Sequence, residues 1–187
     1  MGGREIFNKS TINIPRLNDK VGQEFSMQRS ILIILSLVIS SFVFGQGIKS
    51  VKITDLEKII AESNTPLIIN LWATWCKPCI EEIPYFMEEA KKYSKDSLQL
   101  LLVSLDMEEA YPAQIKKSIA KNKITVPVFW LDETNADYFC PKVDPKWSGA
   151  IPASLFINNK TGYRKFVEEQ LSHEQLKKEI MAMLETH

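Results

Sequence analysis

Cys76 and Cys79 are separated by Lys77 and Pro78 in the segment NLWATWCKPCIEEIP, residues 70–84. A Cys-x-x-Cys pair can supply half of a zinc site, close a structural disulfide or work as a redox-active dithiol. These three uses differ in what must surround the sulfur atoms. The neighbouring residues, and the elements that they form, therefore decide between them.

The reactive form of a cysteine is the thiolate, and a thiol with a pKa of about 8.5 is only ~3% ionised at pH 7. Cys76 follows an apolar run of strand length and directly precedes a helical pattern. We expect its sulfur over a helix N-terminus, where unpaired N–H groups and the helix dipole stabilise an anion. Lys77 adds positive charge, and Pro78 suits the first helical turn. Cys76 is expected to be the exposed attacking thiol and Cys79 the buried resolving thiol.

Zinc binding and a structural disulfide are the weaker alternatives. Cys76, Cys79, Cys140 and His173 would supply four zinc ligands, but no second Cys-x-x-Cys pair or closely spaced histidine pair accompanies the first. A bridge that spans two residues removes little entropy from the unfolded chain, so it gains little stability. We therefore predict a redox dithiol and no metal site. A peroxidase is disfavoured because its reactive cysteine usually stands alone at the start of its helix.

The surrounding sequence predicts alternating helices and strands. The helices are expected from Thr54 to about Ser63, from Lys77 to about Tyr93, over 111–123 and from Ser172 to about Leu184. Capping patterns at Thr54 and Ser172 mark the starts of the first and the last of them. The strands are expected over 67–73, 98–105, 126–131, 153–158 and 163–168. The first three strands alternate with helices, which requires parallel pairing, and the last two form a hairpin. Residues 132–150 are expected to be an insertion or an active-site loop. The fold class is α/β, with a mixed central sheet of about five strands flanked by helices.

The N-terminal part of the chain has the pattern of an export signal. Residues 31–44 are apolar and uncharged, Arg29 precedes them, and small residues suit cleavage after Gly45. The run is short for a membrane span, which needs roughly 20 residues, although an uncleaved anchor remains the alternative. We expect a signal peptide at 27–45 that begins at Met27, and residues 1–26 to be an extension that is not translated or not ordered.

The remaining residues, 46–187, are enough for one domain with its own core. The whole chain has 23 basic and 23 acidic side chains. Removal of residues 1–45 takes away more basic than acidic residues, so the domain is slightly acidic. No basic field is available for nucleic acid or anionic lipid, and we expect neither as a partner. Three cysteines in an exported chain predict one pair and one leftover thiol.

The segment around the cysteines resembles the thioredoxin superfamily, and in particular its TlpA/ResA-like branch of thiol–disulfide oxidoreductases. The resemblance covers about residues 50–185, and the positions that match its motif are Trp72, Ala73, Thr74, Trp75, Cys76, Pro78, Cys79, Glu82 and Pro84. The resemblance implies a thioredoxin-like fold and an exported, periplasmic protein. It also implies dithiol–disulfide exchange, in which Cys76 is the nucleophile and Cys79 resolves the mixed disulfide.

The same resemblance implies further site residues. Pro152 in GAIPAS matches the cis-proline that faces the dithiol, and Ile151 would pair its backbone with a substrate strand. Glu82 matches an acidic residue that is a candidate proton acceptor for Cys79; its alternative is a solvated helix glutamate beside Glu81. Trp75 would form an apolar docking platform. With Lys77, Pro78 and Ile151, it completes the expected substrate-binding set.

Two positions depart from the pattern. Asn70 stands where thioredoxin has a buried aspartate, so that proton relay is not available here. Cys140 has no counterpart: it is either an apolar loop residue or a third thiol close enough to Ile151 and Pro152 to exchange with Cys76.

These features predict a reductase of protein disulfides, such as those in cytochrome c maturation. The cysteine pair is the only cofactor expected. The partners implied are protein substrates and a second protein, an inner-membrane electron donor, for a chain expected to be a monomer. The alternatives are a disulfide-forming oxidant of the same fold and a non-catalytic binding module that handles copper or another metal. Lys77 is the residue expected to tune the direction of electron transfer.

Overall fold

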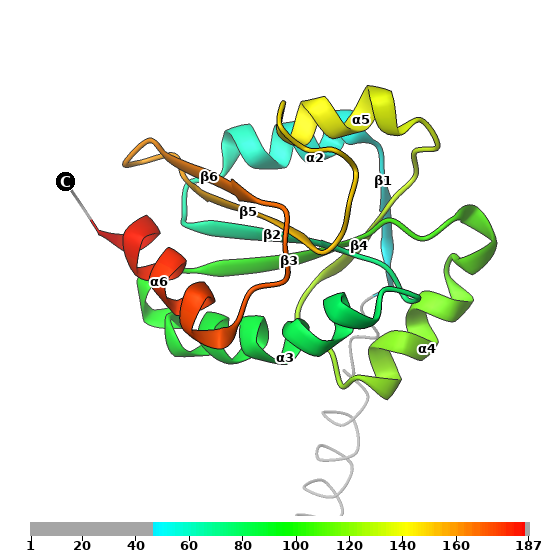
Figure 1. Ribbon diagram of the computed structural model, residues 1–187, viewed down its shortest axis with the longest axis horizontal. Helices are drawn as coiled ribbons and strands as arrows, with labels where there is room; N and C mark the ends of the chain where they lie inside the picture. Colours follow the sequence, from blue (N-terminus) through cyan, green and yellow to red (C-terminus); the bar gives the residue numbers. More distant parts are fainter. Residues whose placement is uncertain (1–46, 186–187) are drawn as a thin grey trace, which may run out of the picture. The chain divides into compact units, whose positions relative to one another are not determined.

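The computed structural model describes residues 47–185 and places six strands and five α-helices there (Figure 1). The elements, in chain order, are β1 Lys49–Val51, α2 Ile53–Glu62, β2 Leu67–Trp72, α3 Lys77–Lys92, β3 Gln99–Ser104, α4 Ala113–Lys121, β4 Val128–Leu131, α5 Ala136–Val143, β5 Ala153–Asn158, β6 Tyr163–Val167 and α6 His173–Leu184. Short 3-10 turns lie at Ser94–Asp96 and Glu108–Ala110. The predicted α/β fold with a mixed sheet is confirmed.

The strands form one sheet in the order β1-β4-β3-β2-β5-β6. Strands β1 to β4 are parallel, as the helical crossovers require, whereas β5 and β6 form an antiparallel hairpin on β2. All six residues of β2 are buried, because strands flank both its edges and helices cover both its faces. Strand β2 therefore enters the site from the centre of the sheet.

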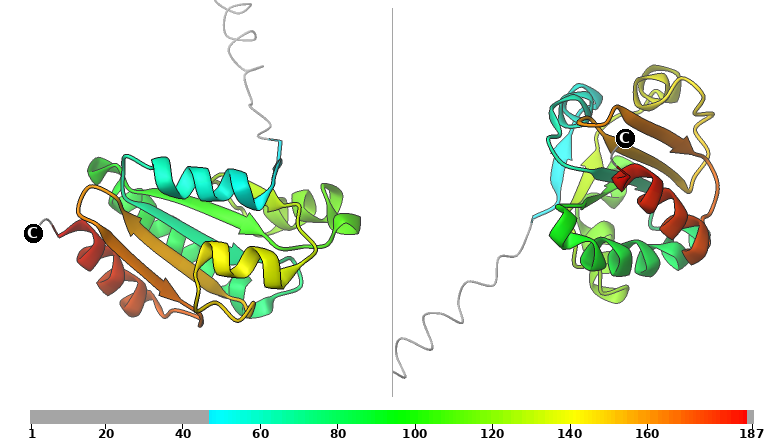
Figure 2. Two further views of the ribbon diagram at one scale, coloured as in Figure 1. Left: turned by 90° about the horizontal axis from the view of Figure 1, so that it is seen from above. Right: turned by 90° about the vertical axis from the view of Figure 1, so that its left-hand side faces the viewer.

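Two helical layers sandwich the sheet (Figure 2). Each layer has its own buried cluster of side chains. Helices α3, α4 and α6 cover one face with Phe86, Ile115 and Leu176, whereas α2 and α5 cover the other with Leu56 and Phe139. Side chains alternate between the faces along a strand. The even-numbered residues of β2 and β5 face α3, and the odd-numbered ones face α2.

Two elements were not predicted from the sequence. Strand β1 has three residues, of which only Val51 is buried, so it carries too little alternation to be recognised. The expected loop at 132–150 was wrong in part, because it contains α5. That helix has Pro141 in its interior and polar residues around it, and only Phe139, Cys140 and Val143 mark its buried side. The sheet thus has six strands, where about five were expected.

The predicted N-cap of α6 is confirmed, whereas the predicted N-cap of α2 is not. Ser172 caps α6 as predicted: its hydroxyl accepts the Gln175 N–H at 3.3 Å, and its own N–H donates to the Gln175 side chain at 2.9 Å. The predicted cap at Thr54 was wrong. The N-cap of α2 is Lys52, two residues earlier, and the Asp55 carboxylate accepts the Lys52 N–H at 3.0 Å.

The predicted signal peptide at 27–45 and the extension at 1–26 lie outside the described residues. Within residues 47–185, no helix combines the length and apolar composition that crossing a bilayer requires.

The packing of α6 on the sheet gives a stability prediction. Leu176 is fully buried in the α3 layer, whereas Met181 on the same helix is 47% exposed. Leu176→Ala should lower the free energy of unfolding by about 2–5 kcal/mol, because it leaves a cavity in the core. Met181→Ala is the matched control and should change it by less than about 0.5 kcal/mol. Urea unfolding followed by circular dichroism measures both, and equal losses would contradict this packing.

Candidate active site

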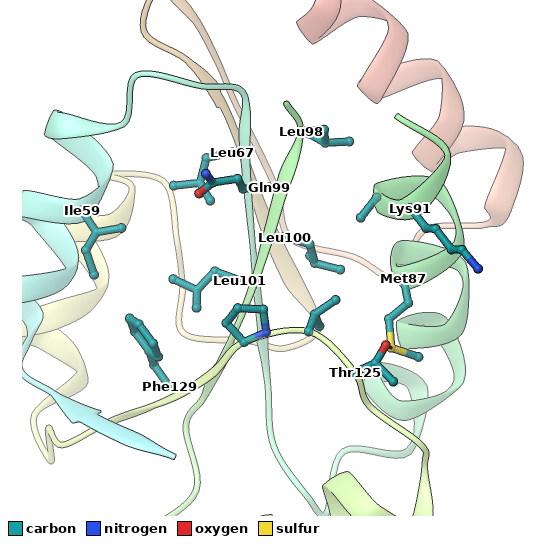
Figure 3. Close-up of a pocket in the computed structure, with 13 residues that line it drawn as sticks. Ile59, Leu67, Met87, Lys91, Leu98, Gln99, Leu100, Leu101, Thr125 and Phe129 are labelled. Carbon is teal, nitrogen blue, oxygen red and sulfur yellow. The ribbon is translucent and has the colours of Figure 1, made fainter. Parts of the chain in front are cut away.

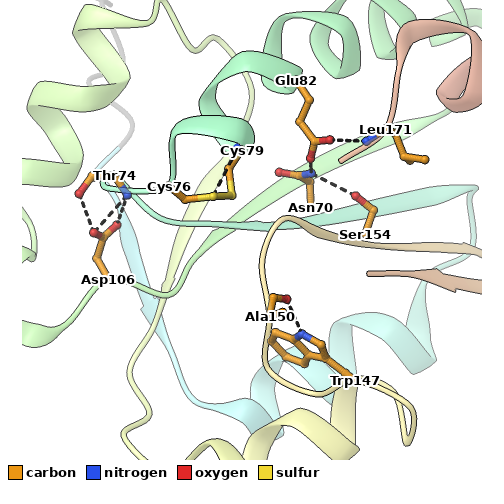
Figure 4. Close-up of a disulfide and its surroundings, with 10 residues drawn as sticks. All are labelled: Asn70, Thr74, Cys76, Cys79, Glu82, Asp106, Trp147, Ala150, Ser154 and Leu171. Atoms are coloured by element: carbon orange, nitrogen blue, oxygen red, sulfur yellow. Dashed lines mark hydrogen bonds between the residues drawn. A yellow bond between two sulfur atoms is a disulfide. The ribbon is translucent and has the colours of Figure 1, made fainter. Parts of the chain in front are cut away.

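Cys76 and Cys79 form a disulfide in the turn between β2 and α3, with Cα atoms 5.3 Å apart (Figure 4). Cys76 is the N-cap of α3, and its sulfur accepts the backbone N–H of Cys79 at 3.3 Å. Pro78 lies in the first turn, where its missing N–H costs no hydrogen bond. The geometry expected of a stabilised thiolate, a sulfur facing the N–H groups of a helix start, is present.

The expectation of an exposed Cys76 was wrong. Cys76 is 4% exposed and Cys79 is fully buried. The reason is that the Cys76 sulfur turns inward, towards Cys79 and the helix start. The exposed surface next to the disulfide belongs to Trp75, whose residue is 70% exposed. Solvent therefore reaches the disulfide only slightly, at Cys76, beside the large apolar side chain of Trp75.

Lys77 reaches into solvent and towards a carboxylate of its own helix. Its side chain is 86% exposed, and its ammonium lies 3.7 Å from the Glu81 carboxylate, one helical turn on. Water and a nearby carboxylate both weaken the field of an exposed charge. Lys77 therefore acts on Cys76 less strongly than its position in the sequence suggests.

Glu82 is buried, so the alternative of a solvated helix glutamate is wrong. Its side chain reaches the space between β2 and the start of α6 (Figure 4). One carboxylate oxygen accepts the Asn70 amide at 2.8 Å, and the other accepts the Leu171 N–H at 2.8 Å. Asn70 also donates to the Ser154 hydroxyl at 3.1 Å. Among the described residues, Asn70 Oδ1 has no hydrogen-bond partner.

Burial raises the pKa of Glu82 to about 7, from an ordinary value of 4.5. The hydrogen bonds from the Leu171 N–H and the Asn70 amide lower it, but they offset only part of the desolvation. A carboxyl group with this pKa can accept or release a proton near neutral pH. It lies three residues after Cys79 on α3, a spacing that places two side chains on one side of a helix.

Asp106 was missed by sequence reasoning, yet it fixes the chain just before Trp75. Its carboxylate accepts the Thr74 N–H at 3.0 Å, the Thr74 hydroxyl at 2.6 Å and the Ser104 hydroxyl at 2.7 Å. Its backbone carbonyl accepts the Trp130 indole N–H at 2.7 Å. The only sequence signal was an aspartate directly after the predicted strand 98–105. Its partner Thr74 is 32 residues away, beyond the reach of local patterns.

The Ile151–Pro152 peptide bond is cis, the conformation that the resemblance implies. In the antiparallel register, Ala153 lies opposite Leu71. The residues just before β5 therefore lie at the end of β2 from which the Cys76 turn departs. The structure thus brings the cis-proline and the disulfide to the same edge of the sheet.

The loop that precedes Ile151 is fixed by one carboxylate oxygen. Glu168 Oε1 accepts the backbone N–H groups of Ser148 and Ala150, each at 3.0 Å, and the Ser148 hydroxyl. Gly149, between them, has φ of +95°, which lets both N–H groups turn to the same side. The Trp147 indole N–H donates to the Ala150 carbonyl at 2.9 Å. Neither Trp147 nor Glu168 had a role assigned from sequence.

Cys140 lies on the other side of the sheet from the disulfide. It belongs to the buried cluster of α2 and α5, whereas Cys76 and Cys79 belong to that of α3. Burial, more than any nearby carboxylate, raises the pKa of the Cys140 thiol to about 11. The structure therefore favours the apolar interpretation of Cys140 over exchange with Cys76. It also does not assemble the four-ligand zinc set with His173.

A groove of about 550 Å³ lies elsewhere (Figure 3). Its walls are mainly apolar and come from α2, α3 and the amino ends of β2, β3 and β4, with Met87, Leu100 and Phe129 among them. The disulfide instead follows the carboxyl end of β2. The groove therefore takes no part in the arrangement around the cysteines.

The sequence was compared with models of protein families, and residues 42–162, more than half of the chain, match the one described as AhpC/TSA family. The chain belongs to the AhpC/TSA family. Its relatives include the sporulation thiol-disulfide oxidoreductase A of Bacillus subtilis, 30% identical over 113 residues, which are 59% of this chain and 63% of that protein. The thiol-disulfide oxidoreductase ResA of Bacillus cereus is 29% identical over 146 residues, 75% and 76% of the two chains.

These relatives confirm the resemblance to the ResA-like branch. The chain spans less than two thirds of the first of them, and 42% of the thioredoxin-like protein YneN of Bacillus subtilis. Solved structures agree on the fold. A thioredoxin-related protein of Neisseria meningitidis serogroup B has a TM-score of 0.55 at 23% identity over 65% of this chain and 86% of that one. A thioredoxin-like protein in its oxidised form has a TM-score of 0.52 at 27% identity, over 67% and 82%.

The buried Glu82 predicts how stability depends on pH. The folded chain keeps a proton on Glu82 at pH values where the unfolded chain has lost it, so ionisation disfavours the folded state. The contribution of Glu82 is complete below pH 4.5 and is lost as the pH rises through about 7. By linkage, this shift corresponds to a loss of about 3 kcal/mol.

Urea unfolding of the oxidised protein between pH 4.5 and 8 measures this loss. Glu82→Gln should remove most of it, because glutamine does not ionise. Glu81→Gln is the matched control on the exposed side of α3, with 54% of its side chain exposed, and should retain it. If the Glu82 variant had the same pH dependence as the parent, the assignment of this loss of stability to Glu82 would be contradicted.

Proposed function

We propose that this protein is an exported thiol–disulfide oxidoreductase that reduces disulfides in other proteins. The observation that carries the proposal is the position of Cys76. Its sulfur caps α3 and is bonded to Cys79, and it lies beside the exposed Trp75. The names of the relatives, thiol-disulfide oxidoreductases, support the same chemistry.

The reaction begins from the dithiol form. The Cys76 thiolate attacks one sulfur of a substrate disulfide, forms a mixed disulfide and releases the other substrate sulfur as a thiolate, which takes up a proton from water. Cys79 then loses its proton and attacks the Cys76 sulfur. This step closes the Cys76–Cys79 disulfide and releases the second substrate thiolate, which is protonated in turn. Two electrons pass from the protein to the substrate.

Glu82 is proposed as the group that takes the proton from Cys79. Cys79 is fully buried, so bulk water does not reach its thiol directly. The pKa of Glu82, raised by burial to about 7, lies closer to that of a thiol than an ordinary carboxylate does. Proton transfer is more favourable when the two pKa values approach each other. The Asn70 amide and the Leu171 N–H hold the carboxylate in place.

Substrate binding is assigned to Trp75, Lys77, Pro78 and the backbone of Ile151. Trp75 offers an exposed apolar surface next to the reactive sulfur, and aromatic residues of this kind often anchor protein contacts. Ile151 and Pro152 lie at the same edge of the sheet, immediately before β5. An extended segment of the substrate would lie between these two surfaces, with its disulfide over Cys76.

The reducing direction is supported by the surroundings of Lys77. A strongly stabilised thiolate favours the reduced protein and so makes it an oxidant. The Lys77 ammonium is solvated and lies 3.7 Å from the Glu81 carboxylate, which weakens one cause of such stabilisation. A reductase of this kind must be reduced again after each turnover. We propose a membrane protein outside this chain as the electron donor, with export directed by residues 27–45.

Trapping tests the proposed exchange. Cys79→Ala should leave substrate proteins attached to Cys76 through a disulfide, because the resolving thiol is missing. Cys76→Ser should trap none and should abolish reduction of insulin disulfides. These complexes appear on gels run without a reductant and vanish when one is added. Undiminished insulin reduction by Cys76→Ser would contradict the proposal and would favour a binding module.

The redox potential of the cysteine pair tests the direction separately. Equilibration with glutathione should give a value near the thioredoxin range, about −270 mV. A value near −120 mV, roughly that of a strong oxidant, would instead identify a protein that forms disulfides.

The loop held by Glu168 makes a further prediction. Glu168→Gln should raise KM for a protein substrate several-fold and leave the potential of the cysteine pair unchanged, because it loosens only the loop before Ile151. Glu169→Gln, at the exposed neighbouring position, is the matched control. Steady-state reduction of a disulfide substrate measures both variants. An unchanged KM in the Glu168 variant would show that the loop keeps its position without this carboxylate.

A further inference from the structure

A second group of polar side chains lies where α3 packs against α6. Glu88 and Glu89 come from the second half of α3, and His173 is the first residue of α6. Each offers one ligand atom, and these atoms all lie within 4.8 Å of one another. None of the three takes part in the disulfide exchange proposed above.

Glu89 is buried with part of its charge unpartnered. Only 2% of its surface is exposed, and Glu89 Oε1 lies 2.9 Å from His173 Nε2. The other oxygen, Oε2, is buried and has no hydrogen-bond partner among the described residues. An unpaired buried carboxylate oxygen is costly. A cation bound to the Glu89 carboxylate would offset part of this cost.

The histidine is already oriented for a ligand. The ring of Tyr85 stacks on that of His173, with centroids 5.1 Å apart and planes within 9° of parallel. This contact restricts the ring while Nε2 faces the carboxylates of α3. A ligand set that is fixed before binding loses less entropy when the ion arrives.

Lys92 is the competing cation. Its ammonium lies 3.5 Å from Glu89 Oε1, but 51% of its side chain is exposed. A flexible lysine at the surface can leave for solvent at little cost. It therefore neutralises Glu89 when no ion is bound and does not close the site.

We propose that Glu88, Glu89 and His173 bind a divalent transition metal, and specifically Zn²⁺. One imidazole nitrogen and two carboxylate oxygens are ordinary zinc ligands, and three protein ligands leave a fourth position for water. Glu88 is exposed, so that position is open to solvent. Mg²⁺ and Ca²⁺ prefer about six or more oxygen ligands and match an imidazole nitrogen less well.

Metal binding here would tie α3 to α6 close to Glu82. Leu171, which donates its N–H to Glu82 at 2.8 Å, stands two residues before His173. Glu82 and Glu89 are two turns apart on α3. The ion would therefore clamp the same junction that holds the buried carboxylate. The metal site itself does not depend on the proposed redox function.

The test uses the full-length protein with its Cys76–Cys79 disulfide closed, so that neither sulfur is free to bind zinc. Isothermal titration with Zn²⁺ should give about one site per chain. The chain has two histidines, His173 and His187. In nitrogen-detected NMR spectra of the imidazole rings, the His173 Nε2 resonance should shift on addition of Zn²⁺.

Three variants assign the ligands. His173→Ala and Glu88→Gln should each weaken Zn²⁺ binding by about tenfold or more. His187→Ala is the matched control and should bind as the parent does. Glu88→Gln changes an exposed side chain, so its effect does not arise from misfolding. Circular dichroism of each variant confirms that the fold is kept.

Removal of the competing charge tests the site in the opposite direction. Lys92→Gln should strengthen Zn²⁺ binding several-fold, because the ion no longer displaces an ammonium group. No His173 shift at millimolar Zn²⁺, or equal affinity in the parent and in His173→Ala, would overturn the proposal. So would weaker binding in His187→Ala than in His173→Ala.

Discussion

The buried Glu82 carboxylate needs hydrogen-bond partners, and most of the site is arranged to supply them. A carboxylate in the interior needs hydrogen-bond donors, and here they come from two separate elements. Asn70 reaches it from the centre of β2, and the Leu171 N–H reaches it from the turn before α6. These bonds connect the middle of the sheet, the helix that carries both reactive cysteines and the C-terminal helix. The geometry around the disulfide therefore depends on how three distant parts of the chain pack.

Local sequence predicted the elements that carry the cysteines, because their signals are complete within a few residues. The apolar run at 67–73 and the helical spacing after Lys77 correspond to β2 and α3. The partners of Glu82 and Asp106 were not predictable in this way. The hydrogen bond from the Leu171 N–H to Glu82 spans 89 residues, and that from the Thr74 N–H to Asp106 spans 32. Backbone donors of this kind carry no side-chain signature, so only the folded chain reveals them.

The sheet separates the reactive pair of cysteines from the third cysteine. Cys76 and Cys79 face the layer of α3, and Cys140 is packed with α5 on the opposite face. A thiol that is buried in apolar surroundings ionises poorly and remains unreactive. Burial raises the pKa of Cys140 to about 11, in keeping with this separation. An odd cysteine in this chain is therefore compatible with a single defined pair.

The Glu168 carboxylate, which anchors the loop before Ile151, lies at an edge of the sheet. Glu168 directly follows β6, one of the two edge strands, which among the described residues pairs with β5 alone. Edge strands open more readily than central ones in native proteins. When β6 separates from β5, the loop loses its carboxylate anchor. The Cys76 turn, which lies beyond β5, keeps its contacts with Asp106 and with the start of α3. Recognition and redox chemistry would thus have different local stabilities within one domain, and hydrogen exchange would detect them as two separate opening events.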